Sequence, residues 1–141
     1  MADDRTLRAI PRVAELLAKA DALLITAGAG MSVDSGLPDF RGGKGFWGAY
    51  PPLEKLGISF EHMAQPHWFG EKPEMAWAFY GHRQQLYRET KPHAGYGKLL
   101  EWGRAMSGGY FVVTSNVDGH FQAAGFPPSR VLEQHGNIHR H

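Results

Sequence analysis

The sequence predicts an α/β fold in which parallel strands are covered by helices, and three observations support this prediction. Short apolar runs alternate with longer amphipathic stretches along the chain, which is the order of elements in α/β proteins. The apolar runs have the length and continuity of strands that are buried on both faces of a sheet. Each run ends in glycine or polar residues. In open α/β sheets ligands bind beyond the carboxyl ends of the strands, so we expect a site there.

Strands and helices can be placed from these patterns. The predicted strands cover residues 22–27, 110–114 and 131–134. The predicted helices cover about 10–20, 73–89, 93–106 and, more briefly, 121–124. Pro11 and Pro73 suit the first turn of a helix, where the missing N–H costs nothing.

Residues 28–60 are expected to be mostly loop, with a short helix after Gly30. This segment holds eight of the 18 glycines, together with Pro38, Pro51 and Pro52. A connection this long is uncommon in a compact domain unless it is functional or mobile.

The composition excludes several classes of protein. The chain has 15 Lys and Arg against 14 Asp and Glu, and this balance disfavours a nucleic-acid partner. Its 141 residues include no cysteine, which excludes a disulfide framework, a thiol nucleophile and a cysteine-ligated zinc within them. The acidic residues at the start of the sequence do not resemble a signal peptide, so we expect none, and no apolar run approaches the roughly 18 residues that span a bilayer. We expect residues 1–141 to form a single cytoplasmic domain without a membrane partner.

A Gly28-Ala29-Gly30 turn follows the first predicted strand. Such a turn lets backbone N–H groups approach a pyrophosphate at the start of a helix. Val33 occupies the third glycine position of the G-x-G-x-x-G pattern. Taken alone, the turn is equally compatible with phosphate binding and with tight geometry.

Three motifs together resemble the sirtuins, the NAD-dependent protein deacylases. Residues 28–42 read GAGMSVDSGLPDFRG and are similar to the cofactor-binding signature of that family. Residues 114–118, TSNVD, resemble its Thr-Gln-Asn-Ile/Val-Asp segment, and residues 132–136, LEQHG, resemble the segment with its catalytic histidine. The motifs occur in the family's order, at predicted strand ends, and the resemblance extends from about residue 20 to 136.

The resemblance implies a Rossmann-like domain that uses NAD. The implied cofactor-binding residues are Gly28, Ala29, Gly30, Ser32, Asp39, Phe40, Arg41, Ser115, Asn116, Val117 and Asp118. Among them, Phe40 would lie over the nicotinamide end, Arg41 would contact phosphate or ribose, and Asp118 would hold the nicotinamide carboxamide.

The implied catalytic residues are His135 and Asn116. In the reaction that the resemblance implies, the acyl oxygen of an acyl-lysine peptide or protein attacks the ribose carbon as nicotinamide leaves. A cationic transition state at the sugar is stabilised by carboxylate and carbonyl groups. His135 would then be the base that activates a ribose hydroxyl, a task that suits histidine. Asn116 would position a water and the nicotinamide ribose.

The chain departs from the family pattern in two places. Ser115 replaces a glutamine that helps to hold the ribose. In sirtuins a zinc module with two Cys-x-x-Cys pairs, and then the rest of the nucleotide-binding sheet, follow the catalytic histidine, whereas this sequence ends at His141 without cysteine. We therefore expect a partial domain with an open sheet edge. A homo-oligomer or swapped assembly would cover that edge.

The leading functional hypothesis is an NAD-dependent protein-lysine deacylase of sirtuin type, which transfers the acyl group to ADP-ribose. One alternative is a truncated, non-catalytic nucleotide-binding remnant or partner-dependent half, and another is an NAD hydrolase. A dehydrogenase is disfavoured because Asn116 and Asp118 have no role in hydride transfer. His135, His139 and His141 lack a cysteine or carboxylate partner nearby, so we expect no metal site.

Overall fold

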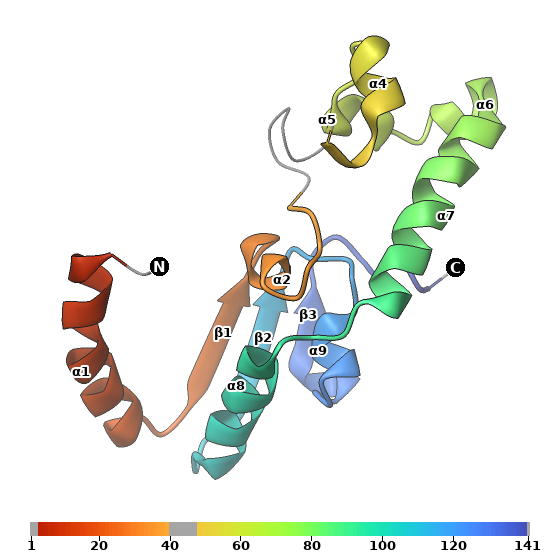
Figure 1. Cartoon of the computed structure of the whole chain (residues 1–141). Helices are drawn as coiled ribbons and strands as arrows, with labels where there is room; N and C mark the ends of the chain where they lie inside the picture. Colours follow the sequence, from red (N-terminus) through yellow and green to blue (C-terminus); the bar gives the residue numbers. More distant parts are fainter. Residues whose placement is uncertain (1–2, 40–47, 141) are drawn as a thin grey trace.

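The computed structural model describes residues 3–39 and 48–140 and confirms the α/β prediction. Its elements, in chain order, are α1 (Asp4–Lys19), β1 (Leu23–Ala27), α2 (Gly30–Val33), α4 (Pro51–Lys55), α5 (Phe60–Met63), α6 (Trp68–Glu71), α7 (Pro73–Glu89), α8 (Ala94–Ala105), β2 (Tyr110–Thr114), α9 (His120–Ala123), the 3-10 turn η1 (Pro128–Arg130) and β3 (Val131–Glu133) (Figure 1). The predicted residues Phe40, Arg41 and His141 lie outside the described part of the chain.

The three strands form one parallel sheet in the order β1-β2-β3. Ala27 at the end of β1 pairs with Thr114 at the end of β2, and Thr114 pairs with Glu133 at the end of β3. Two hydrogen bonds continue past the strand ends: Ser115 N donates to Ala27 O at 3.1 Å, and Gln134 N donates to Thr114 O at 2.9 Å. The carboxyl ends of all three strands therefore share one edge of a partial Rossmann-like fold.

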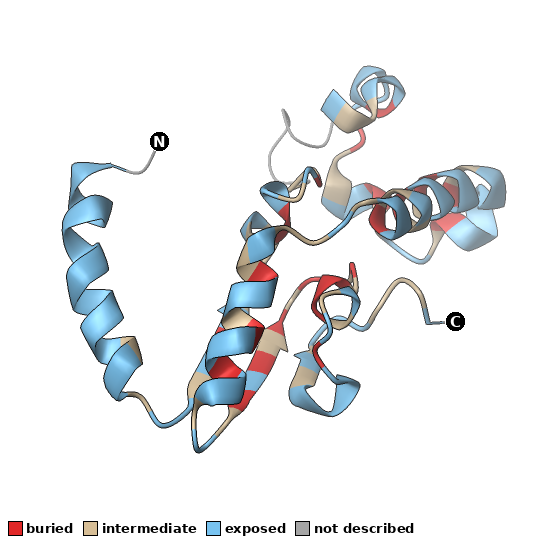
Figure 2. Ribbon diagram, turned by 60° about the horizontal axis from the view of Figure 1, so that its bottom comes forward, coloured by how far each residue is buried: buried red, intermediate tan, exposed pale blue. Residues whose placement is uncertain are grey.

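Among the described residues, the sheet is covered on one face. Ile25 and Val112 point into a core formed with α8, α9 and the following loop, which contribute Tyr96, Leu100, Phe121 and Phe126. Side chains alternate along a strand, so the opposite face carries Leu24, Phe111 and Leu132, which are 66%, 38% and 51% exposed. Figure 2 shows the exposed residues of the strands beside the buried ones.

Helix α1 begins earlier than predicted, at Asp4 rather than near residue 10. The Asp3 carboxylate accepts a hydrogen bond from Thr6 N at 2.7 Å and caps the helix, and Pro11 lies inside it rather than in the first turn. No described residue of α1 is buried, although Ile10 and Val13 form part of an apolar stripe. Figure 1 shows α1 standing apart from the sheet.

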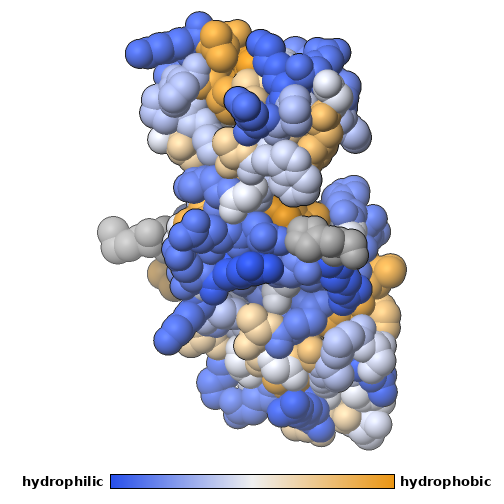
Figure 3. Space-filling view, turned by 90° about the vertical axis from the view of Figure 1, so that its right-hand side faces the viewer, coloured by the Kyte–Doolittle hydropathy of each residue, from blue (hydrophilic) through white to orange (hydrophobic). Residues whose placement is uncertain are grey.

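A second apolar core lies in the helical module that we define as α4 to α7. Its buried residues are Leu37, Leu53, Ile58, Met63, Trp68, Ala76, Phe79 and Tyr87. The prediction of mostly loop over residues 28–60 missed α4, and α5 begins only at its end, whereas the short helix after Gly30 is present as α2. Helices of four or five residues show no period in the sequence, and burial against α7 holds these two in place. Figure 1 shows α4, α5 and α6 above the sheet, and Figure 3 shows the molecular surface on the right-hand side of that view, where apolar patches lie among polar residues.

Candidate functional site

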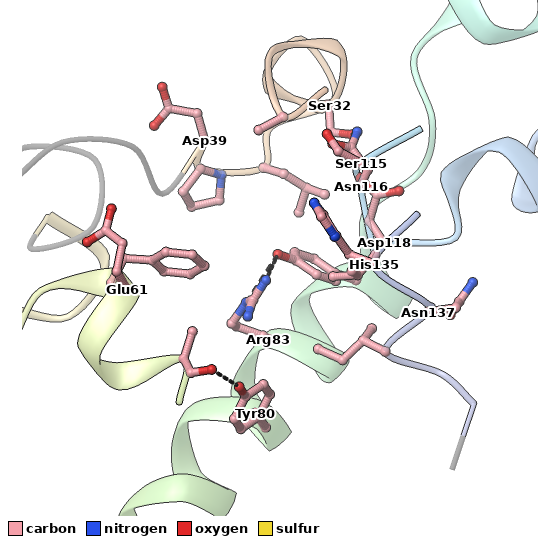
Figure 4. Close-up of a pocket in the computed structure, with 18 residues that line it drawn as sticks. Ser32, Asp39, Glu61, Tyr80, Arg83, Ser115, Asn116, Asp118, His135 and Asn137 are labelled. Atoms are coloured by element: carbon pink, nitrogen blue, oxygen red, sulfur yellow. Dashed lines mark hydrogen bonds between the residues drawn. The ribbon is translucent and has the colours of Figure 1, made fainter. Parts of the chain in front are cut away.

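A cavity of about 660 Å³ lies at the carboxyl edge of the sheet, between the strand ends and the helical module (Figure 4). Its walls include eight of the residues that the sequence predicts for the site: Ala29, Ser32, Asp39, Ser115, Asn116, Val117, Asp118 and His135. Gly28 and Gly30 flank this set in the turn before α2 and do not line the cavity. The fold thus gathers the described candidates from three strand ends into one place.

Ser32 and Asp118 form the centre of the polar wall. The Ser32 hydroxyl donates to Asp118 Oδ2 at 2.5 Å, and the backbone N–H of His120 donates to Asp118 Oδ1 at 3.0 Å. Ser32 and Asp118 are both buried. Both oxygens of the carboxylate are therefore held by donors from the protein, which fixes the direction in which it faces the cavity.

Asn116 is held in the same wall by its own amide. Its Nδ2 donates to Gly28 O at 3.0 Å and lies 3.3 Å from Ser32 Oγ, which also accepts. The backbone N–H of Asn116 donates to Thr114 Oγ1 at 3.0 Å. These contacts join the end of β2 to the Gly28-Ala29-Gly30 turn, so the predicted motifs depend on one another for their geometry.

The Gly28-Ala29-Gly30 turn is compact and leaves room beside it. Met31 N donates to Gly28 O at 2.9 Å, and Ser32 N donates to Ala29 O at 3.1 Å. A Cβ built on Gly30 would have no atom within 4 Å, and Gly30 is exposed. This open surface next to the cavity leaves room for a phosphate group of a nucleotide to approach the backbone. The buried Asn116 amide and Asp118 carboxylate can bind polar groups elsewhere on the same nucleotide.

His135 reaches the cavity from the loop after β3. Figure 4 shows its side chain directed into the cavity near Asn116 and Asp118. The loop is anchored on the neighbouring segment: Ile138 N donates to Val117 O at 2.9 Å, and Gln84 Nε2 donates to Ile138 O at 3.0 Å. An exposed histidine on a fixed loop can exchange protons with a ligand in the cavity.

The opposite wall, which α5 and α7 supply, was not predicted from the sequence. Tyr80, Arg83 and Tyr87 line the cavity at intervals of three and four residues, which places them on one face of α7. Tyr80 donates from its hydroxyl to Ala64 O at 3.0 Å and so ties α7 to the end of α5. No local signal in the sequence predicts this wall, because an arginine on a helix is ordinarily a solvated charge.

Arg83 is a buried cation, with only 6% of its surface exposed. Its Nε and Nη2 donate to the Tyr87 hydroxyl at 3.2 and 2.9 Å. The rings of Phe60, Phe79 and Tyr87 have their centres 5.2 to 5.4 Å from its Cζ. Burial raises the pKa of Tyr87, and the adjacent Arg83 opposes that rise. Glu61 of α5 also lines the cavity and is exposed (Figure 4).

No metal cluster is present in residues 3–39 and 48–140, where no three His, Cys, Asp or Glu side chains are placed to hold an ion. His139 does not join His135, because its Nε2 contacts Asp118 O at 3.1 Å. In the same part of the chain, no helix is long and apolar enough to cross a membrane.

A parallel sheet with a polar cavity at its carboxyl edge defines the partial Rossmann-like class, and comparisons with known proteins specify the family. The Sir2 family pattern matches residues 28–141. NAD-dependent protein deacylase 2 of Pyrobaculum aerophilum is 39% identical over 129 residues, 91% of this chain and 47% of that protein. An NAD-dependent protein deacylase of Aquifex aeolicus is 34% identical over 116 residues, 82% of this chain and 44% of that protein.

Solved structures agree with these relatives. A Sir2 homologue in complex with NAD matches with a TM-score of 0.70 at 30% identity, over 90% of this chain and 45% of that chain. The chain therefore belongs to the Sir2 family, which confirms the predicted resemblance. It spans about half the length of the curated relatives that it matches.

His120, next to the site, makes the structure sensitive to acid. Its ring is 1% exposed and neither ring nitrogen has a hydrogen-bond partner in the described chain. Burial lowers the pKa of His120 below 6.5 and outweighs the opposing effects of Asp118 and of the nearby backbone groups of Thr90 and Tyr87. Above pH 6.5 both the folded and unfolded states are neutral at this residue. As the pH falls below 6.5, the unfolded state binds a proton that the folded state resists, so stability decreases.

We expect His120→Leu to reduce this loss of stability. Urea unfolding at pH 7.5 and 5.5 measures it as the difference in unfolding free energy between the two pH values. His62→Leu, at an exposed histidine, is the matched control and should keep the wild-type difference. An unchanged difference in His120→Leu would contradict the assignment.

Proposed function

We propose that this chain carries the NAD-binding and acyl-lysine-binding half of a Sir2-type protein deacylase. The observation that carries the proposal is the convergence of Ser32, Asn116, Asp118 and His135 on one cavity at the carboxyl edge of the sheet. Relatives named as NAD-dependent protein deacylases, and a homologue solved with NAD, support it. The proposed reaction transfers the acyl group of a lysine to ADP-ribose with release of nicotinamide.

Four polar residues of the cavity wall have a role in this proposal. NAD, when bound, supplies the ADP-ribose acceptor and the nicotinamide leaving group. The fixed carboxylate of Asp118 accepts hydrogen bonds from the carboxamide and offsets positive charge at the sugar. Asn116 orients the ribose and a water. His135 removes the proton from a ribose hydroxyl, while the short side chain of Ser115 leaves the ribose with fewer direct contacts than a glutamine would.

Arg83 favours an acyl group that ends in a carboxylate. The guanidinium lies in the wall opposite Asp118 and Asn116, on the helical module. Its planar fork suits a carboxylate, and a charge-assisted hydrogen bond is strong where water is excluded. Three aromatic rings around it exclude water from that side. The acyl chain would thus enter between the two walls and place its own charge beside Arg83.

The central prediction concerns nicotinamide release. We expect the folded chain to release nicotinamide from NAD only when an acyl-lysine peptide is present. His135→Ala should abolish continued release over many turnovers, because without the base the reaction stops after the first nicotinamide has left. Chromatographic measurement of nicotinamide checks both. Release without peptide would identify an NAD hydrolase instead. Folded protein without turnover would favour the alternative of a nucleotide-binding remnant or partner-dependent half.

A second prediction concerns the acyl group. We expect Arg83→Met to lower kcat/KM for a succinyl-lysine peptide by about 10- to 100-fold, the effect of losing a charged hydrogen bond, and to change acetyl-lysine turnover by much less. Arg12→Met, at an exposed arginine of α1, is the matched control. An equal decrease for both peptides would contradict the assignment of Arg83 to the acyl carboxylate.

A third prediction concerns assembly, because an apolar sheet face of this kind favours association. We expect the isolated chain to form a dimer or larger assembly that covers Leu24 and Leu132, which face solvent on the same side of the sheet. Light scattering after size exclusion should show a smaller mass for the Leu24→Lys/Leu132→Lys double variant. Lys98→Leu, a change at an exposed position of α8, should not reduce the mass. A monomeric wild type would contradict the proposed assembly.

A further inference from the structure

Tyr96 is fully buried on α8 and does not line the cavity, yet its hydroxyl lies 3.0 Å from Ser32 Oγ. A serine hydroxyl has one proton, and Ser32 donates it to Asp118 Oδ2. Tyr96 must therefore be the donor in its contact with Ser32. The protons point in one direction, from Tyr96 to Ser32 and from Ser32 to Asp118.

The Ser32 hydroxyl makes every hydrogen bond that it can make. It donates to Asp118 and accepts from both Tyr96 and Asn116 Nδ2, which uses its donor and both acceptor sites. Removal of the Tyr96 hydroxyl would let the Ser32 hydroxyl rotate away from Asp118. Hydrogen bonds in series also strengthen one another, so the Ser32 to Asp118 bond would weaken.

His93, the N-cap residue of α8, holds α2 and the segment just after it at two further points. His93 N donates to Ser35 Oγ at 3.0 Å. The His93 ring accepts from Gly95 N at Nδ1, so its Nε2 is the donor to Met31 O at 2.9 Å. Helix α2 has only four residues and no side-chain cap of its own. Helix α8 therefore places the helix that carries Ser32.

The Tyr96 ring is held independently of its hydroxyl. Its centre lies 4.9 Å from the rings of His93 and Phe121 and 5.9 Å from that of His120. Burial raises the pKa of Tyr96 to about 12, so the hydroxyl stays a donor throughout the neutral range. A change to phenylalanine keeps these ring contacts and removes only the donor.

We infer that Tyr96 is a positioning residue: through Ser32 it holds the Asp118 carboxylate toward the nicotinamide end of NAD. The inference rests on the proposed function, in which Asp118 accepts the nicotinamide carboxamide. Tyr96 acts on that end of the ligand alone, because within residues 3–39 and 48–140 its side chain has a polar contact only with Ser32. Its loss should therefore weaken binding of NAD and spare ADP-ribose, which lacks nicotinamide.

Calorimetric titration of the full chain with NAD and with ADP-ribose tests this. We expect Tyr96→Phe to raise the Kd for NAD by about 3- to 10-fold, the usual effect of one hydrogen bond, and to leave the Kd for ADP-ribose within about twofold. Ser32→Ala should weaken NAD binding at least as much. In the Ser32→Ala background Tyr96→Phe should add little, because the two residues act through one contact.

Tyr110→Phe is the matched control, since Tyr110 is a buried tyrosine of the same core that does not line the cavity; it should change neither Kd. Equal weakening of both ligands by Tyr96→Phe, no weakening, or full additivity with Ser32→Ala would overturn the inference. A wild type that binds neither ligand would instead overturn the proposed function itself. Should Tyr96→Phe fail to fold, NMR of the Tyr96 Cζ carbon decides: NAD must shift this signal more than ADP-ribose does in the wild type, and Ser32→Ala must remove the difference.

Discussion

The parallel, in-register pairing of three strands is the constraint on which the site depends. Because Ala27, Thr114 and Glu133 are neighbours at one edge, the segments that follow them must begin side by side. Each of those segments is short and polar, and each is tied to the next by backbone or side-chain hydrogen bonds. The cavity therefore follows from strand pairing first and from individual side chains second.

Much of this arrangement could be predicted from the sequence because its signals are local. The strands, the helix over 73–89 and the polar strand ends can each be recognised in the sequence by a periodicity or a motif. No knowledge of their neighbours in the fold is needed. The wall with Arg83 has no such signal, since an arginine on a helix is ordinarily a solvated charge. Its burial depends on Phe60 and Tyr87, which only the packing of α5 against α7 brings to it. For the same reason the short helices α4 and α5 were not expected.

Two apolar cores surround the cavity and give its walls different origins. The core beneath the sheet supports Ser32, Asn116 and Asp118 through α8 and α9, whereas the core of the helical module supports Tyr80 and Arg83. The walls meet where Gln84 of α7 donates to Ile138 in the loop that carries His135. A ligand that contacts both walls would fix the helical module relative to the sheet. His135 lies where the two walls meet.

Ionic strength acts differently on the charges of these walls. Salt at physiological concentration screens exposed charges beyond about 8 Å but screens buried ones much less. Glu61 is exposed to solvent, so its attraction for any positively charged group of a ligand declines as salt is added. Arg83 is enclosed by aromatic rings and keeps most of its field. Under the proposed function, concentrated salt would therefore shift selection from the residues around the modified lysine to the chemical group that the lysine carries.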